Sequence, residues 1–285
     1  EKYKAFLDTA RTERLAAAEI IRRAEEKGFK PVYTMKSLKA GDKVYWNQKD
    51  KSVILAVIGK EPVHEGIKIV GSHIDSPRLD LKANPVHEQD GIVYFRTHYY
   101  GGIKKYQWTC IPLALIGVVF TKDGKKVDIN IGLKDSDPVF YVSDLLIHMA
   151  QDQMKKTLAE GITGEQLQAV AGTHSEEGQT PKDAIMTLLK KEYGIEEEDF
   201  AAAELELVPA TKSRDVGFDR SLIASYGQDD RVCSYANLEA ILDAKPGVKT
   251  QAALLTDKEE IGSYGNTGME SSYFCLLYTS DAADE

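Results

Sequence analysis

An unbroken run of six apolar residues, 53–58, constrains the fold of this chain more than any other feature. A strand with one face in solvent alternates polar and apolar residues, whereas a continuous apolar run is typical of a strand buried on both faces. Strands of that kind occur mainly in sheets covered by helices. A second apolar run at 251–255 repeats the signal near the other end of the chain. The sequence therefore predicts an α/β fold.

Changes in the pattern of predicted helices and strands, together with the tail, divide the chain into four parts. Residues 1–81 predict a helix capped by Thr12, a hairpin through 44–58 and a strand over 67–70. Residues 82–213 differ: they hold an apolar run ending at Phe120, an expected helix at 144–158, a helix opened by Thr180 and Pro181, and a half-exposed strand at 203–207. The α/β pattern returns over 214–274, with a helix at 232–244. We therefore predict a domain at 82–213 that is inserted into the α/β domain.

We interpret the last eleven residues, 275–285, as foreign to the natural protein. Their back-translation resembles a sequencing adapter read in frame, which predicts a non-native tail. The alternative is an ordinary acidic C-terminal tail.

Charge and cysteine content exclude several classes of partner. The 36 basic and 45 acidic residues give a net charge of −9, which disfavours binding to nucleic acid or to anionic membranes. The longest apolar stretch, 108–120, is too short to span a bilayer. Three scattered cysteines cannot build a disulfide framework and favour a reducing compartment. We expect a soluble, cytoplasmic protein.

Three polar clusters follow predicted strands or precede a predicted helix: 73–75, 228–231 and 259–260. His73 and Asp75 lie on the same side of an extended segment, where a carboxylate can accept the second ring N–H of a metal-bound histidine. One of Glu259 and Glu260 could bind a metal while the other carries a proton, and Asp229 could bridge two cations. Each pattern alone is common on protein surfaces. Together at strand ends, where α/β sheets bind ligands, they predict a di-metal hydrolase.

Three sequence motifs resemble those of a known protein family. Gly71–Arg78 (GSHIDSPR), Tyr100–Gly102 (YGG) and Asp257–Ser263 (DKEEIGS) resemble the aspartyl aminopeptidase family, peptidase family M18, and its bacterial branch most closely. The resemblance runs from about Glu1 to Tyr273. It implies an aminopeptidase-like α/β zinc-peptidase domain, with a mixed sheet covered by helices, interrupted by an inserted α+β dimerisation domain. It also implies two divalent metal ions, usually zinc, peptide substrates, and large homo-oligomers, commonly tetrahedral dodecamers.

The resemblance also implies site roles. His73 would ligate one metal, Glu260 the other, and Asp229 would bridge both, while Glu259 would be the general base and Asp75 would orient His73. His148 matches a family histidine that reaches a neighbouring subunit's active site; the alternative is a helix histidine satisfied within its own domain. Arg78, Lys104 and Lys105 could favour acidic substrate side chains.

One departure from the family pattern affects activity. The family supplies two further metal ligands, an aspartate and a histidine, downstream of the Glu-Glu pair, and this chain ends before either position. We therefore expect an aminopeptidase in the intact protein and no activity in the 285-residue chain. The alternatives are another co-catalytic zinc hydrolase, such as a deacylase or carboxypeptidase, and a non-catalytic assembly subunit or inert fragment.

Overall fold

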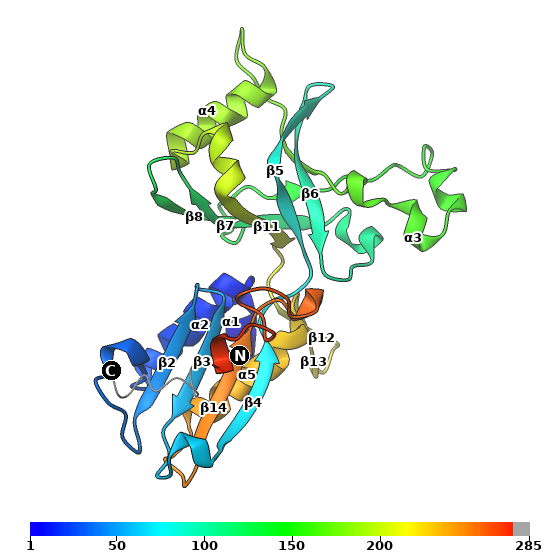
Figure 1. The fold of residues 1–285 in the computed structure, drawn as a ribbon. Helices are drawn as coiled ribbons and strands as arrows, with labels where there is room; N and C mark the ends of the chain where they lie inside the picture. The colour runs from blue at the N-terminus through cyan, green and yellow to red at the C-terminus, as the bar shows by residue number, and fades with distance from the viewer. Residues whose placement is uncertain (276–285) are drawn as a thin grey trace. The chain divides into compact units, whose positions relative to one another are not determined.

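The computed structural model describes residues 1–275, which form two compact units (Figure 1). Unit 1 consists of Glu1–Ser76 and the chain from Lys212 onward, and unit 2 of Pro77–Thr211. The boundaries thus lie at 76/77 and 211/212, where the sequence placed them at 81/82 and 213/214. The chain leaves unit 1 directly after the His73–Asp75 motif. Residues 276–285, nearly all of the expected non-native tail, lie outside the described residues.

Unit 1 is built on a five-stranded mixed sheet in the order β1-β2-β3-β14-β4. The strands are β1 (Lys30–Pro31), β2 (Lys43–Gln48), β3 (Ser52–Val57), β4 (Ile67–His73) and β14 (Thr250–Thr256). β2 and β3 form the predicted antiparallel hairpin. β14 lies between β3 and β4, antiparallel to the first and parallel to the second. The predicted α/β class with a mixed sheet is confirmed.

Three helices cover one face of this sheet: α1 (Lys2–Thr9), α2 (Glu13–Glu26) and α5 (Gln228–Leu242) (Figure 1). Thr12 caps α2, as predicted, by accepting a hydrogen bond from the amide of Leu15. Every residue of β3 is buried. Its Leu55 packs with the helices, whereas Ile54 packs on the opposite face. The apolar run therefore indicated burial on both faces correctly.

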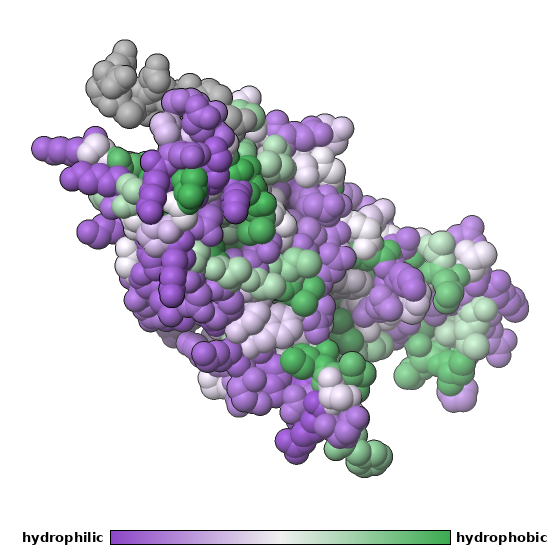
Figure 2. All heavy atoms as spheres, turned by 90° about the horizontal axis from the view of Figure 1, so that it is seen from below, coloured by the Kyte–Doolittle hydropathy of each residue, from purple (hydrophilic) through white to green (hydrophobic). Residues whose placement is uncertain are grey.

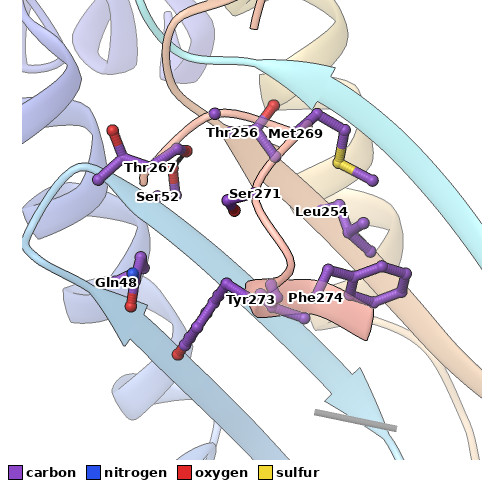
Figure 3. A pocket seen from close by; sticks show the side chains of 11 residues that line it. Gln48, Ser52, Leu254, Thr256, Thr267, Met269, Ser271, Tyr273 and Phe274 are labelled. Carbon is purple, nitrogen blue, oxygen red and sulfur yellow. Dashed lines mark hydrogen bonds between the residues drawn. The ribbon is translucent and has the colours of Figure 1, made fainter. Parts of the chain in front are cut away.

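The opposite face of the sheet is covered in a different way. Val44, Ile54 and Leu254 form a small cluster there, against which Tyr273 and Phe274 pack. The segment that carries these aromatic residues passes over β3 and β14 (Figure 3). It leaves a small hollow that is lined by Leu254, Tyr273 and Phe274. A short hairpin, β12 (Arg214–Val216) and β13 (Leu222–Ala224), completes the strands of this unit.

Unit 2 is an α+β unit with a seven-stranded sheet in the order β11-β5-β6-β10-β9-β7-β8. Pairing of β11 with β7 closes six of these strands into a ring. The strands are β5 (Arg78–Gln89), β6 (Ile92–Tyr100), β7 (Pro112–Phe120), β8 (Lys126–Ile131), β9 (Phe140–Tyr141), β10 (Ala169–Gly172) and β11 (Ala203–Pro209). Helix α4 (Pro181–Tyr193) begins after Thr180, whose hydroxyl accepts from the amide of Asp183 in a capping box.

The sequence predicted β11 as half-exposed, and this is wrong. Residues 205–208 are all buried, in a strand that pairs with β5 on one side and β7 on the other. Its Glu206 is 3% exposed and lies 3.4 Å from the guanidinium of Arg78. Ion pairing with a buried arginine allows a charged residue to occupy this interior position.

The predicted helix at 144–158 is also wrong. The structure has only a 3₁₀ turn, η4 (Gln153–Lys155), and a single helical turn, α3 (Leu158–Gly161), in this region. Helices in proteins are stabilised mainly by burial of an apolar face. Here the apolar side chains are 51–73% exposed: Leu145, Leu146, Ile147, Met149, Met154 and Leu158. We call this set the exposed apolar segment; Figure 2 shows apolar side chains gathered at the end of the view where α3 lies.

No helix among residues 1–275 combines the length and the apolar character needed to cross a membrane.

Candidate metal centre

The ends of β4 and β14 bring the polar clusters of unit 1 together. The two strands are parallel, and Thr256, the last residue of β14, pairs with His73, the last residue of β4. The 3₁₀ turn η7 (Glu259–Ile261) follows β14 directly, after Lys258 in a left-handed conformation. The Glu259-Glu260 pair therefore lies beside the His73 side chain.

His73 is held by Asp75. The Nδ1 atom of His73 lies 3.2 Å from a carboxylate oxygen of Asp75 and 3.1 Å from its carbonyl oxygen. The imidazole is largely buried, and its Nε2 atom faces the carboxylates of Asp229 at 3.2 Å and Glu259 at 3.6 Å. A histidine whose Nδ1 is engaged by a carboxylate presents Nε2 to a metal in a fixed orientation.

Asp75 also connects the two strand ends. Its fully buried carboxylate accepts hydrogen bonds from the amides of Glu259, at 3.2 Å, and Glu260, at 3.3 Å. These residues are 184 and 185 positions from Asp75 in the sequence. One carboxylate therefore positions the histidine and both glutamates.

Three of the predicted ligands converge on one point. The donor atoms of His73, Asp229 and Glu260 all lie within 4.8 Å of one another. Asp229 and Glu259 are accessible from solvent, with side chains 88% and 58% exposed. Imidazole and carboxylate donors at such spacing suit zinc and similar divalent cations.

The electrostatics of this cluster favour a cation. Burial alone would lower the pKa of His73, but the hydrogen bond and charge of Asp75, with the charges of Asp230 and Glu259, raise it to about 9. Burial and the neighbouring carboxylates Asp75, Asp229 and Glu259 raise the pKa of Glu260 to about 7, against the opposing effect of His73. Protons thus bind tightly where negative charge is crowded. A divalent cation can replace them and relieve the same repulsion.

The remaining predicted residues lie elsewhere. His148 belongs to unit 2, where its side chain is exposed on a turn rather than on the expected helix. Arg78 is buried, stacks 3.8 Å from the ring centre of Tyr100 and pairs with Asp80 and Glu206. Its guanidinium is therefore engaged within unit 2, which contradicts the idea that it recognises acidic substrates.

Two residues near the ligands had no role in our sequence interpretation. Ser76 directly follows Asp75, and Arg231 directly follows the Asp229-Asp230 pair. Their contacts cross more than 150 positions of sequence. Only the placement of Arg231 in the polar cluster 228–231 could have indicated it.

A helix-covered mixed sheet, with a histidine and acidic residues grouped where its strands end, defines a candidate metal-dependent hydrolase. Comparison with known proteins identifies the family. Residues 6–280 match the family described as "Aminopeptidase I zinc metalloprotease (M18)", and the chain belongs to this M18 peptidase family. The resemblance inferred from the three motifs is confirmed.

Bacterial relatives and solved structures agree. The chain is 49% identical to the "Probable M18 family aminopeptidase 1" of Clostridium acetobutylicum over 96% of its length. It is 46% identical to the protein of that name from Borrelia garinii subsp. bavariensis, again over 96%. The chain spans 61% of each relative. The structure of an M18 aminopeptidase from Thermotoga maritima matches with a TM-score of 0.94 and 41% identity, covering all of this chain and 64% of that one.

Proposed function

We propose that the protein to which this chain belongs is a di-metal aminopeptidase that removes N-terminal residues from peptides. Family membership and the convergence of His73, Asp229 and Glu260 support this function. The family name supports zinc as the metal; the count of two ions rests on the resemblance. The observation that carries the proposal is the grouping of these donors around the buried Asp75 carboxylate.

Each residue has a proposed task. His73 and Glu260 would each hold one ion, and Asp229 would be shared by both. The bound ions would lower the pKa of water and polarise the scissile carbonyl. Glu259, exposed beside the ligands, accepts a proton from the attacking water and returns it to the leaving amine. Asp75 keeps the imidazole of His73 in place throughout.

The substrate and its specificity are part of the proposal. A free α-amine near the ligands limits cleavage to the first residue. Preference for acidic residues at that position is a proposal resting on the resemblance and on the exposed Lys104 and partly exposed Lys105, since Arg78 is engaged elsewhere.

Self-association through unit 2 is proposed as well. The exposed apolar segment offers six large apolar side chains to a partner. A second copy of the protein is the partner that the resemblance implies, in a dimer that builds larger assemblies such as dodecamers. His148 lies within the same segment and would reach the neighbouring subunit's site.

A cytoplasmic location stays a proposal. It rests on the scarcity of cysteine in the sequence, which has only Cys110, Cys233 and Cys275.

The test is hydrolysis of three substrates by the longest natural protein that contains this chain, loaded with zinc: an aspartyl or leucyl amide, its N-acetylated form, and an N-acetylated peptide with a free C-terminus. We expect cleavage of an aspartyl or leucyl amide and no cleavage of its N-acetylated form. A protein that prefers the N-acetylated amide, or that removes only C-terminal residues, would instead be the deacylase or carboxypeptidase alternative. A zinc-loaded protein inactive on all three would support a non-catalytic subunit.

A further inference from the structure

Asp229 lies before the regular part of α5. Its backbone angles, φ −89° and ψ 114°, and those of Asp230, φ −114° and ψ 33°, are not helical. The hydrogen bonds of a regular helix therefore do not fix the position of the Asp229 carboxylate. A metal ligand outside a regular element needs support from surrounding groups, because affinity depends on ligands being in place before the ion arrives.

A buried guanidinium supplies support of this kind. The hydroxyl of Ser76 donates to the main-chain carbonyl of Asp229 at 2.8 Å and accepts from Nη1 of Arg231. Nη2 of Arg231 donates to the carbonyl of Arg11 at 3.1 Å. The Arg231 side chain is 1% exposed. One guanidinium thus joins the segment before α2, the segment after β4 and the start of α5.

Gly227 shows how closely the chain fits around this group. It adopts a left-handed conformation with φ +75°, and a Cβ at this position would lie 2.1 Å from Nη1 of Arg231. Any other residue would displace the guanidinium or the start of α5. The backbone there is consequently shaped around Arg231.

Ser76 and its neighbour Asp75 hold different ligands. Asp75 accepts the amide of Glu260, and Ser76 donates to the carbonyl of Asp229. Both residues follow His73 at the end of β4. Asp75 and Ser76 therefore fix Glu260 and Asp229, respectively, relative to His73. Arg231 in turn holds the Ser76 hydroxyl that contacts Asp229.

We propose that Arg231, acting through Ser76, is a positioning residue of the metal centre. It holds the main chain of Asp229 so that the carboxylate stays close to Nε2 of His73, where both can share a cation. The inference rests on the proposed metal site and adds the group that organises it. Lysine cannot replace arginine here, because a single ammonium lacks the planar fork that donates to Ser76 and Arg11 at once.

The experiment compares Arg231→Lys and Ser76→Ala with the wild type in the longest natural protein that contains this chain. Zn²⁺ affinity is measured by competition with a chelator, and the visible spectrum of bound Co²⁺ reports the ligand geometry. We expect both variants to bind Zn²⁺ about 10- to 100-fold more weakly and to change the Co²⁺ spectrum. Amide hydrogen exchange of residues 228–231 in the metal-free protein should be faster in both.

Matched controls are Arg220→Lys and Ser221→Ala, whose parent residues are exposed. These should leave all three measurements unchanged. If Arg231→Lys does not fold, Ser76→Ala, which removes one hydroxyl, still tests the inference. Unchanged Zn²⁺ affinity and spectrum in a variant whose thermal midpoint falls would reduce Arg231 to a structural role and overturn the proposal. A wild-type protein that binds no Zn²⁺ would overturn the metal centre itself, and this role with it.

Discussion

The ligand cluster of unit 1 and the exposed apolar segment of unit 2 show opposite ways of using side chains. In the cluster, polar groups from three distant segments form hydrogen bonds with one another. The single side chain of Asp75 contacts His73, Glu259 and Glu260. In the segment, apolar groups such as Leu146 and Met149 are each 71% exposed. The first region is organised by contacts within the chain. The second has the composition of an interior and the exposure of a surface, which is typical of a binding face.

The largest effect is expected at the ligand cluster, when Asp229, the ligand proposed to be shared by both ions, is removed. Asp229→Ala should abolish binding of both ions, and hydrolysis should fall by more than the roughly 10²–10⁴-fold expected from loss of a general base alone. Metal analysis of the purified protein checks this. Retention of two equivalents of zinc per chain would show that Asp229 is not the bridge.

A milder change at the same site separates proton transfer from metal binding. Glu259→Gln keeps the size of the side chain but cannot accept a proton, so turnover should fall about 10²–10⁴-fold with metal content unchanged. Glu270→Gln, at an exposed position in the following loop, is the matched control. Near-normal turnover in Glu259→Gln would remove Glu259 from the mechanism.

The exposed apolar segment should respond to charge instead. Leu146→Asp and Met149→Asp place a carboxylate on the proposed interface, and each should weaken self-association by about 10-fold or more. Gln151→Asp adds the same group at an exposed polar position nearby. Sedimentation equilibrium gives the dissociation constants. If all three variants associate like the wild type, the segment serves another partner or none.

The smallest expected effect concerns Asp257, which is 2% exposed behind the ligand cluster. Burial and the charge of Glu13 raise the pKa of Asp257 to about 6, despite a hydrogen bond from Thr267. A carboxyl whose pKa is raised on folding stabilises the fold at low pH, and that stability is lost as pH rises from about 4 through 6. Asp257→Asn should therefore be more stable than the wild type above pH 6, by up to about 3 kcal/mol, and about equal near pH 4.

Urea denaturation at several pH values measures this difference. A gap between the two proteins that does not change with pH would show that the Asp257 carboxyl titrates normally. The same experiment on Asp144→Asn, at an exposed position beside the apolar segment, provides the comparison.

Local patterns were enough to predict much of the fold. Thr12 and Thr180 cap helices because a hydroxyl before a helix satisfies its first amides, whatever lies further away. The run 53–58 gave β3 because continuous apolar character leaves a strand no exposed face. His73, Asp229 and the Glu-Glu pair could be grouped because strand ends collect ligands in such sheets.

Long-range contacts account for what could not be predicted. Glu206 alternates with leucines in the sequence, and only the folded unit shows that it is buried beside Arg78. The contact between Ser76 and Arg231 joins residues 155 positions apart. The segment 144–158 has the apolar content of an amphipathic helix but no packing that would use it. Apolar periodicity does not tell whether the partner is the same chain or another molecule.

The position of β14 between β3 and β4 has a consequence for how the protein is made. During translation, β3 and β4 emerge before unit 2, and the strand that separates them emerges after it. At about 5–20 residues per second, the 184 positions between Asp75 and Glu259 take roughly 10–40 s to synthesise. Throughout that interval β4, which ends at His73, has no partner strand, and an unpaired strand is prone to pairing with other nascent chains. The ligand cluster therefore forms late, after β14 and the Glu-Glu pair have been made, and unit 2 has time to fold before it.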